Sequence, residues 1–317
     1  MAQQPKAKVK LSHYFRYTLE FLVLMVFNVV LFVLPWFITW RLGRGFGWSA
    51  YYLLKKRRGT IEQNVKRAFP DKDQDAQEAL IKGCYMHWGE SFISTLKLWM
   101  ISGRKARSLV DAPGLDAYVL QAQKVKDPIL YFTGHFGSWE MAGRYVAGIG
   151  VGGASIYRIQ RNPMVNWFLT WIREYHNLKL ISSWSGMRAF EEGMVKYSCL
   201  AVVGDQYKRS GGVTVDYFGQ PSSTPKGAAV LTYRVKPRLV VLICRQNRGR
   251  YRIDIEEIQY ALPESMSQDW IKEITQELTT KLETEVRKTP EQYFWFHRRW
   301  RDLDRADAKR EKARADH

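Results

Sequence analysis

The pattern of apolar positions divides the chain into an apolar N-terminal stretch and a longer body of alternating elements. Residues 21–40 contain no charged side chain, and twenty helical residues extend about 30 Å, the thickness of the hydrocarbon core of a bilayer. The run ends in large and basic residues rather than in a small-residue cleavage site, so we expect a retained membrane anchor. Asn28 and Pro35 within it allow a tilted or re-entrant path. A buried core helix is the alternative interpretation.

The body begins with helical spacing and then changes to short apolar runs between amphipathic stretches. Helices are predicted over 60–69 and 74–101. From residue 128 onward, strands are predicted at 128–133, 154–157, 178–181, 199–203, 239–244 and 251–255, and helices at 138–146, 163–175, 185–197, 226–235 and 267–287. Residues 206–224 are predicted to be a long loop in which residues 213–218 are extended. The alternation is typical of an α/β fold with a mixed central sheet flanked by helices.

Three regions follow from these patterns. Residues 1–45 are expected to form a basic N-terminus and a membrane anchor helix, residues 46–300 a single globular domain, and residues 301–317 a tail of mixed charge.

Net charge narrows the classes of partner. The chain has 49 Lys and Arg against 31 Asp and Glu, a net charge of +18, which indicates an anionic partner. Aromatic residues make up 14% of the chain and include 12 Trp, a composition that favours a membrane interface. The basic residues form no recognised nucleic-acid motif, so we expect no nucleic-acid partner. Basic residues flank the apolar run on both sides, and the larger cluster after it favours a cytoplasmic body that contacts anionic headgroups.

The cysteines indicate neither a metal site nor a disulfide framework. Cys84, Cys199 and Cys244 lie far apart and form no pair at metal-ligand spacing. We expect them to be buried apolar residues in a reducing compartment, and we expect no bound metal.

A candidate reactive pair lies at a predicted strand-to-helix turn. His135 is predicted to lie on the loop and Glu140 in the first helical turn after it. A histidine at the end of a strand can accept a hydroxyl proton near neutral pH, and a carboxylate beside it can fix the imidazole tautomer. The alternative is a helix-capping Glu and a surface His that never meet.

The context of this pair resembles the late acyltransferases of lipid A biosynthesis, the lauroyl and myristoyl transferase family. Five blocks carry the resemblance in the same order, over about residues 15–300. They are Asn64-Val-Lys-Arg-Ala-Phe-Pro70, Gly134-His-Phe-Gly-Ser-Trp-Glu140, Tyr157-Arg-Ile-Gln-Arg-Asn-Pro163, Gly204-Asp-Gln206 with Lys226-Gly-Ala-Ala229, and Pro290-Glu-Gln-Tyr-Phe-Trp-Phe-His-Arg-Arg-Trp300.

The resemblance implies a reaction and its partners. A fatty acyl group would pass from an acyl carrier protein thioester to a hydroxyl of a lipid A precursor, with His135 as general base and Glu140 as its partner. The acceptor would lie in the bacterial inner membrane and the catalytic domain on its cytoplasmic face. No cofactor is needed, because the thioester is already activated. Another glycolipid, lysophospholipid or aminolipid acceptor, and acyl coenzyme A as donor, remain open.

Further residues of the same blocks become candidates for substrate binding. Arg158 and Arg161 can hold phosphates of the acceptor or stabilise charge on the thioester oxygen. Asp205 can orient an Arg or a His, and Gln206 is expected to face the same cleft. Arg298, with its neighbours, is a candidate phosphate contact; a solvated basic face is the alternative.

Overall fold

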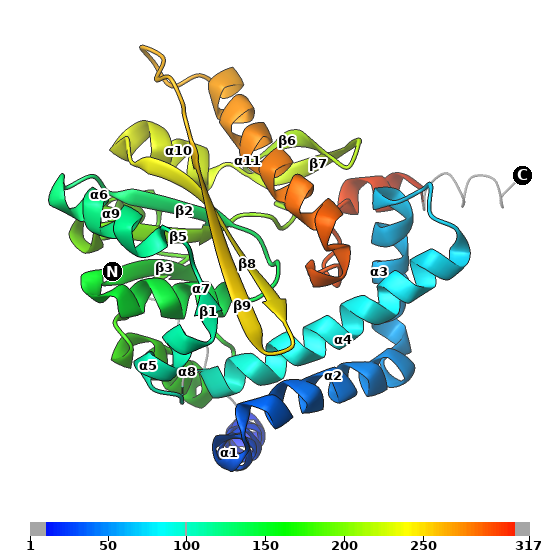
Figure 1. The fold of residues 1–317 in the computed structure, drawn as a ribbon. Coiled ribbons are helices and arrows are strands. Elements are labelled where there is room, and N and C mark those ends of the chain that lie inside the picture. Colours follow the sequence, from blue (N-terminus) through cyan, green and yellow to red (C-terminus); the bar gives the residue numbers. More distant parts are fainter. Residues whose placement is uncertain (1–10, 99, 308–317) are drawn as a thin grey trace, which may run out of the picture.

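The fold is built on a mixed seven-stranded sheet, which confirms the predicted class. The computed structural model describes residues 11–98 and 100–307 (Figure 1). The strand order is β1-β9-β8-β2-β5-β3-β4, and the paired strands are parallel except for the antiparallel β8 and β9. The strands are β1 (Val110–Asp111), β2 (Ile129–Thr133), β3 (Gly153–Tyr157), β4 (Leu178–Ser182), β5 (Cys199–Val203), β8 (Arg238–Asn247) and β9 (Arg250–Ile258).

Helices cover both faces of this sheet, because β2 and its neighbours are apolar on both sides. Leu130 and Phe132 pack into a core with helices α9, α10 and α11, whereas Ile129 and Tyr131 face α6, α7 and α8. The sequence of a strand that is buried on both faces is a continuous apolar run, as in β2. These helices are α6 (Leu115–Lys124), α7 (Trp139–Val146), α8 (Pro163–Tyr175), α9 (Met187–Tyr197), α10 (Gly227–Val235) and α11 (Gln268–Lys288). A short π-helix, η1 (Ala147–Val151), follows α7, and α5 (Gly103–Ser108) precedes β1.

The segment predicted as a loop at 206–224 instead contains a β-hairpin. Strands β6 (Gly212–Tyr217) and β7 (Gln220–Pro225) pair in antiparallel fashion apart from the main sheet. Phe218 and Gly219 connect them with φ values of 56° and 70°, as the tight turns of two-residue hairpins require. The extended segment predicted at 213–218 forms as β6, but the second strand and the hairpin were not predicted, because a phenylalanine at positive φ is not a recognisable turn signal.

The apolar N-terminal segment forms two helices rather than one. Helix α1 (Leu11–Val33) ends before Pro35, and α2 (Trp36–Leu53) begins after it. A proline lacks the N–H needed to continue a helix, which explains the break inside the predicted run of 21–40. Among the described helices, α1 alone is long and apolar enough to cross a membrane, over His13–Val33.

Helix α2 packs closely on α4 (Gln74–Leu98) through glycines. A Cβ atom at Gly47 would lie 2.1 Å from the carbonyl oxygen of Tyr85, and one at Gly89 would lie 2.3 Å from that of Gly43. The two backbones therefore touch, and α2 belongs to the body. It also runs without a break across residue 45, where a domain boundary is predicted from the sequence.

The C-terminal region is part of the core. The closing segment, residues 290–300, starts with a 3-10 turn, η2 (Pro290–Gln292), and buries Trp295 and Trp300 almost completely. Asn64 in α3 (Lys55–Ala68) donates to two backbone carbonyls of this segment, each at 2.7 Å. Residues 301–307 continue as a helix that pairs with Arg67 through Asp304 and Asp307, so the predicted tail begins ordered. Residues 308–317 lie outside the described part of the chain.

Candidate active site

The predicted reactive loop lies at the C-terminal edge of the sheet. Residues 134–138 connect β2 to α7, and β2 pairs in parallel with β5, so that Thr133 stands beside Val203. The residues that follow β5 therefore emerge next to the residues that follow β2. This register brings Asp205 and Gln206 to His135 from about seventy positions away, at the edge where open α/β sheets place their ligands.

His135 is held by a buried carboxylate. Its Nδ1 lies 2.7 Å from Oδ1 of Asp205, whose side chain is only 2% exposed. Burial alone would raise the pKa of Asp205, but the charge of His135 and hydrogen bonds from its ring and backbone outweigh burial and hold that pKa below its usual value. Asp205 is thus a carboxylate that accepts a hydrogen bond from Nδ1–H, and this tautomer puts the basic lone pair of the imidazole on Nε2.

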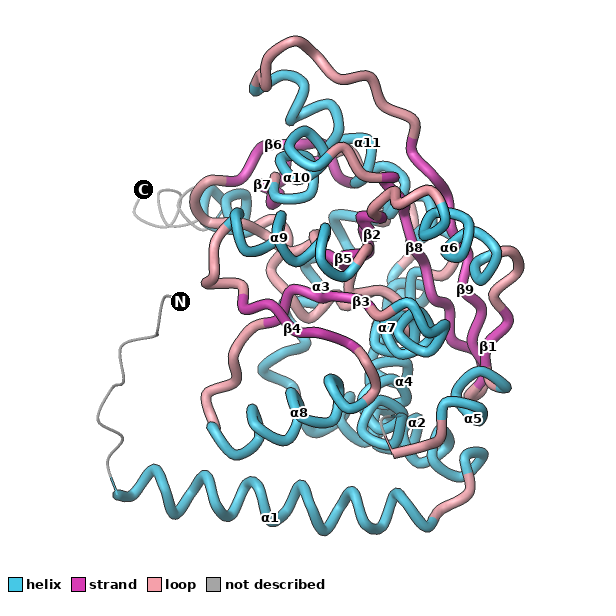
Figure 2. Tube along the Cα trace, turned by 90° about the vertical axis from the view of Figure 1, so that its left-hand side faces the viewer, coloured by secondary structure: helices cyan, strands magenta, loops and turns pink. Residues whose placement is uncertain are grey.

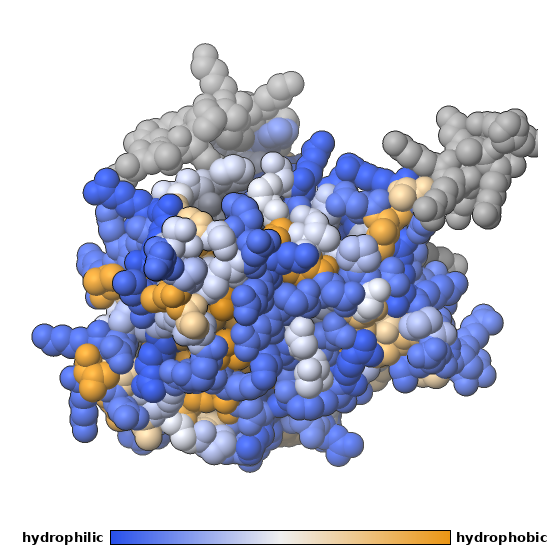
Figure 3. Space-filling model, turned by 90° about the horizontal axis from the view of Figure 1, so that it is seen from above, coloured by the Kyte–Doolittle hydropathy of each residue, from blue (hydrophilic) through white to orange (hydrophobic). Residues whose placement is uncertain are grey.

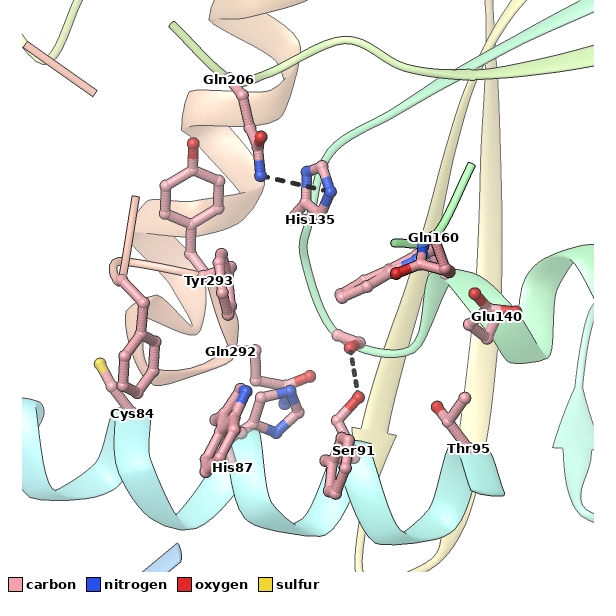
Figure 4. Close-up of a pocket in the computed structure, with 16 residues that line it drawn as sticks. Cys84, His87, Ser91, Thr95, His135, Glu140, Gln160, Gln206, Gln292 and Tyr293 are labelled. Atoms are coloured by element: carbon pink, nitrogen blue, oxygen red, sulfur yellow. Dashed lines mark hydrogen bonds between the residues drawn. The ribbon is translucent and has the colours of Figure 1, made fainter. Parts of the chain in front are cut away.

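The other ring nitrogen faces Gln206. The Gln206 side-chain nitrogen lies 3.3 Å from Nε2 of His135 (Figure 4), and an amide N–H can donate to an unprotonated Nε2. The Trp139 ring packs edge-on against the imidazole, with ring centroids 5.0 Å apart. The imidazole thus lies between the Gln206 amide and an apolar ring.

Glu140 is not the partner of the imidazole in this structure. The sequence predicts that Glu140 holds the His135 tautomer, but Asp205 takes that place and Glu140 forms an ion pair with Arg173 of α8 at 2.5 Å. Residue spacing within one segment cannot show which carboxylate contacts His135, because Asp205 comes to the site from the end of the neighbouring strand. Glu140 still lies close by, and it faces the same space as His135.

Contacts from three directions fix the reactive loop. Gly137 has a φ of 55°, and a Cβ there would lie 1.9 Å from the carbonyl oxygen of Cys244. Its N–H donates to the carbonyl of Gln292, and its carbonyl accepts from the Ser91 hydroxyl at 3.3 Å (Figure 4). The β8 strand, the closing segment and α4 thus all hold the turn that presents His135.

A second histidine lies directly beneath this loop. His87 of α4 is 8% exposed and hydrogen-bonds to the backbone of Gly137. Burial lowers the pKa of His87 to about 4, although the hydrogen bond opposes the shift. Its Nε2 has no partner among the described residues. His87 is therefore a neutral imidazole that helps to position the Gly137 carbonyl. Neither it nor Ser91 stood out in the sequence, because each is an ordinary residue on a helical face.

Two cavities meet at His135. The helix cavity, of about 600 Å³, lies between α4, the reactive loop and the closing segment. The sheet cavity, of about 560 Å³, lies between α7 and strands β2, β3, β4 and β5. Five residues line both: His135, Trp139, Glu140, Gln160 and Gln206. A group bound in either cavity can therefore reach the same base.

The arginines predicted to bind substrate are placed differently from one another. Arg158 lines the sheet cavity, whereas Arg161 and Arg298 are exposed and line neither cavity. Arg299, next to the last of these, is 2% exposed and donates to the backbone and side chain of β7. Within 11–98 and 100–307 we find no group of three His, Cys, Asp or Glu side chains arranged to hold a metal ion.

Comparisons with known proteins identify the family of the chain. Residues 5–302 match the model of the bacterial lipid A biosynthesis acyltransferase family. The chain is 26% identical to the lipid A biosynthesis palmitoleoyltransferase of Escherichia coli K12, over 84% of this chain and 86% of that protein. It is 24% identical to the lauroyltransferase of the same organism, over 95% and 97% of the two chains. A lipid A biosynthesis acyltransferase of Haemophilus influenzae is 24% identical, over 90% and 91%. The chain belongs to the bacterial lipid A biosynthesis acyltransferase family and is an acyltransferase of that pathway.

Proposed function

We propose that this enzyme transfers a fatty acyl group from an acyl carrier protein thioester to a hydroxyl of a lipid A precursor, with His135 as general base. The observation that carries the proposal is the contact of Nδ1 of His135 with buried Asp205 at the junction of two cavities. Two substrates must meet at one base in this reaction, and this geometry provides for that.

The chemistry needs one proton acceptor and an oriented pair of substrates. Nε2 of His135 takes the proton of the acceptor hydroxyl as its oxygen attacks the thioester carbon. The tetrahedral intermediate then collapses, the C–S bond breaks, and the imidazolium returns the proton to the leaving thiolate. Asp205 stabilises the imidazolium between these steps. Binding both substrates at the junction makes the reaction effectively intramolecular, which supplies much of the rate.

The two cavities fit different substrates. The helix cavity is lined by Trp88, Phe92 and Phe296. Because Phe92 is 45% exposed, the cavity opens at an apolar part of the surface, and it therefore suits the membrane-bound acceptor. Arg158 and Lys208 line the sheet cavity, where basic side chains suit an acidic carrier protein. Apolar and small residues between α7 and the sheet suit the acyl chain that the carrier delivers.

We assign Glu140 a role in orienting the acceptor rather than in holding the His135 ring. Glu140 lines both cavities and is held by Arg173. A carboxylate in that position can accept a hydrogen bond from the acceptor and orient its hydroxyl toward Nε2 of His135.

The proposed location is the cytoplasmic face of the bacterial inner membrane. Apolar α1 and the net charge of +18 support it, because a basic protein with an apolar helix is attracted to anionic headgroups.

The test is acyl transfer by the detergent-purified enzyme. Labelled acyl carrier protein thioester is incubated with a Kdo-bearing lipid A precursor, in parallel with acyl coenzyme A as donor and with lysophospholipid as acceptor. We expect label in the lipid A precursor from the carrier protein donor. Transfer that requires coenzyme A, or that occurs only to the lysophospholipid, would overturn the donor or the acceptor assignment.

A further inference from the structure

Helix α1 lies lengthwise against the catalytic body, and its N-terminal half is fastened to the active-site segment. The side-chain nitrogen of Asn162 donates to the carbonyl of Tyr17 at 2.9 Å and to Glu20 at 3.0 Å. Asn162 also caps α8 and is 6% exposed. The Phe21 ring packs edge-on against Phe168 of α8.

The C-terminal half of α1 is fastened as well. Asn28 and Leu31 are 3% and 1% exposed, and the Lys97 ammonium group of α4 donates to the carbonyl of Leu34, just after the helix. Figure 2 shows α1 running along the lower edge of the molecule, beneath α8 and close to α2. Contacts at both ends mean that α1 does not project away from the body.

The outward side of α1 is apolar and continues onto two neighbouring helices. We call this the lipid-facing surface. Its members are large apolar side chains at least 38% exposed: Phe15, Leu19, Leu22, Val23, Val26, Phe27, Val29, Val30, Phe32 and Val33 on α1, Phe37, Leu42, Phe46 and Trp48 on α2, and Trp167, Trp171 and Tyr175 on α8. The α8 residues lie four apart on one helix face, where the Trp167 and Trp171 rings stack and the Tyr175 ring lies tilted against Trp171. Figure 3, which views the molecule from the opposite side, shows a largely hydrophilic face.

We propose that α1 lies in the plane of one membrane leaflet and does not span the bilayer, and that the lipid-facing surface of α1, α2 and α8 is the docking surface for that leaflet. A helix that crossed the bilayer would carry the body packed along it to the same depth. Exposed Arg161 and Glu174 on and beside α8 would then lie in hydrocarbon, where charged groups are costly. An in-plane helix leaves them in the headgroup region.

The composition of the surface identifies its occupant as lipid rather than a second copy of the chain. Trp and Tyr rings border an aliphatic strip, and Arg16 and Arg41 are exposed beside it. Aromatic rings favour the headgroup level and basic groups contact anionic lipid, so this mixture of side chains suits a membrane interface. In this arrangement Asn162 links the lipid-facing surface to the segment that carries Arg158 and Gln160, so the active site lies at a fixed height above the leaflet.

The first test reads topology without using catalysis. The inference rests on the membrane location proposed above, but labelling reports on it even if the acceptor assignment fails. The three native cysteines are buried, so single variants His13→Cys, before the apolar part of α1, and Ser265→Cys, in the exposed β9–α11 loop, provide the readable thiols. A membrane-impermeant maleimide is added to spheroplasts and to inverted inner-membrane vesicles of the expression host, with detergent-solubilised protein as the reactivity control.

The in-plane arrangement puts both positions on the same side. We expect both variants to react in inverted vesicles and neither to react in spheroplasts. Reaction of His13→Cys in spheroplasts, with Ser265→Cys reacting only in inverted vesicles, would show that α1 spans the membrane and would overturn the inference.

The second test measures the contribution of α8. Trp167→Ser/Trp171→Ser is compared with Leu262→Ser/Met266→Ser, whose side chains are 39% exposed in the β9–α11 loop at the far end of the molecule (Figure 1). Binding to vesicles of phosphatidylethanolamine and phosphatidylglycerol is measured by flotation. We expect the tryptophan pair to weaken binding about tenfold and the control pair to leave it unchanged. Equal vesicle binding by both pairs would remove α8 from the docking surface. If the tryptophan pair dissociated a dimer without weakening vesicle binding, the surface would be assigned to a second copy of the chain.

Discussion

Replacing His87 by asparagine should make the folded protein less sensitive to mild acid. His87 is buried under the reactive loop, and burial lowers its pKa from the ordinary value of 6.5 to about 4. Between these two pH values the unfolded chain binds a proton that the folded chain excludes. Stability therefore falls as the pH falls from 6.5 toward 4, because the unfolded state binds more protons over that range.

The size of the effect follows from the pKa difference. Each unit corresponds to 1.36 kcal/mol, so His87 costs about 2 kcal/mol at pH 5 and about 3 kcal/mol near pH 4. His87→Asn removes the titrating group but keeps a side-chain N–H that can donate to the Gly137 carbonyl. The loss of melting temperature from pH 7 to pH 5 should therefore be about 4 °C smaller in the variant than in the wild type.

Thermal unfolding in detergent at several pH values provides the assay. The acidic groups that also titrate are present in both proteins, so the difference between the two pH profiles isolates His87. Parallel profiles for wild type and His87→Asn would refute the reasoning, since a buried neutral histidine cannot be silent there. A variant that melts far lower at pH 7 would instead show that asparagine does not preserve the contact with Gly137.

Substitutions at two glycines and one asparagine give three further predictions. Gly137→Ala should lower acyl transfer at least about tenfold in initial-rate assays, because its Cβ would collide with the carbonyl of Cys244 and alanine is strained at this positive φ. Gly47→Leu should separate α2 from α4 and destabilise the protein by about 3 kcal/mol or more in thermal unfolding, whereas Gly45→Leu, with nothing within 4 Å of its Cβ, should not. Asn64→Ala leaves two carbonyls of the closing segment without their donor and should cost about 2–4 kcal/mol by the same measurement. Unchanged rates or melting temperatures in these variants would contradict the assigned contacts.

Local patterns predicted most elements of the sheet because each carries its own signal. The helix predicted over 163–175 forms as α8, with Asn162 accepting from the N–H groups of its first turn, and the strand predicted at 199–203 forms as β5. Elements with weak signals were missed. Strand β1 is two residues long, and α6 begins after Gly114, at positive φ, instead of after a side-chain cap.

The candidate site was only partly predictable for a different reason. The sequence singled out His135, Glu140, Asp205 and Gln206, but the distances among them depend on strand order. Asp205 reaches His135 because β5 lies next to β2, although β3 and β4 come between them in the chain. Residue spacing carries no information on that pairing, so the choice of Asp205 over Glu140 as the imidazole partner had to come from the structure.

The measurement that tests the central claim most directly is a single-turnover acyl-transfer assay on four proteins: wild type, His135→Ala, Asp205→Asn and Glu140→Gln. Melting temperatures confirm that each is folded. If His135 is the base and Asp205 its partner, His135→Ala abolishes transfer. Asp205→Asn slows the chemical step by about a hundredfold or more and makes its rate more pH-dependent. Glu140→Gln mainly raises the KM for the acceptor. Near-normal turnover by folded His135→Ala would contradict the account, and a chemical step lost in Glu140→Gln but kept in Asp205→Asn would return the partner role to Glu140.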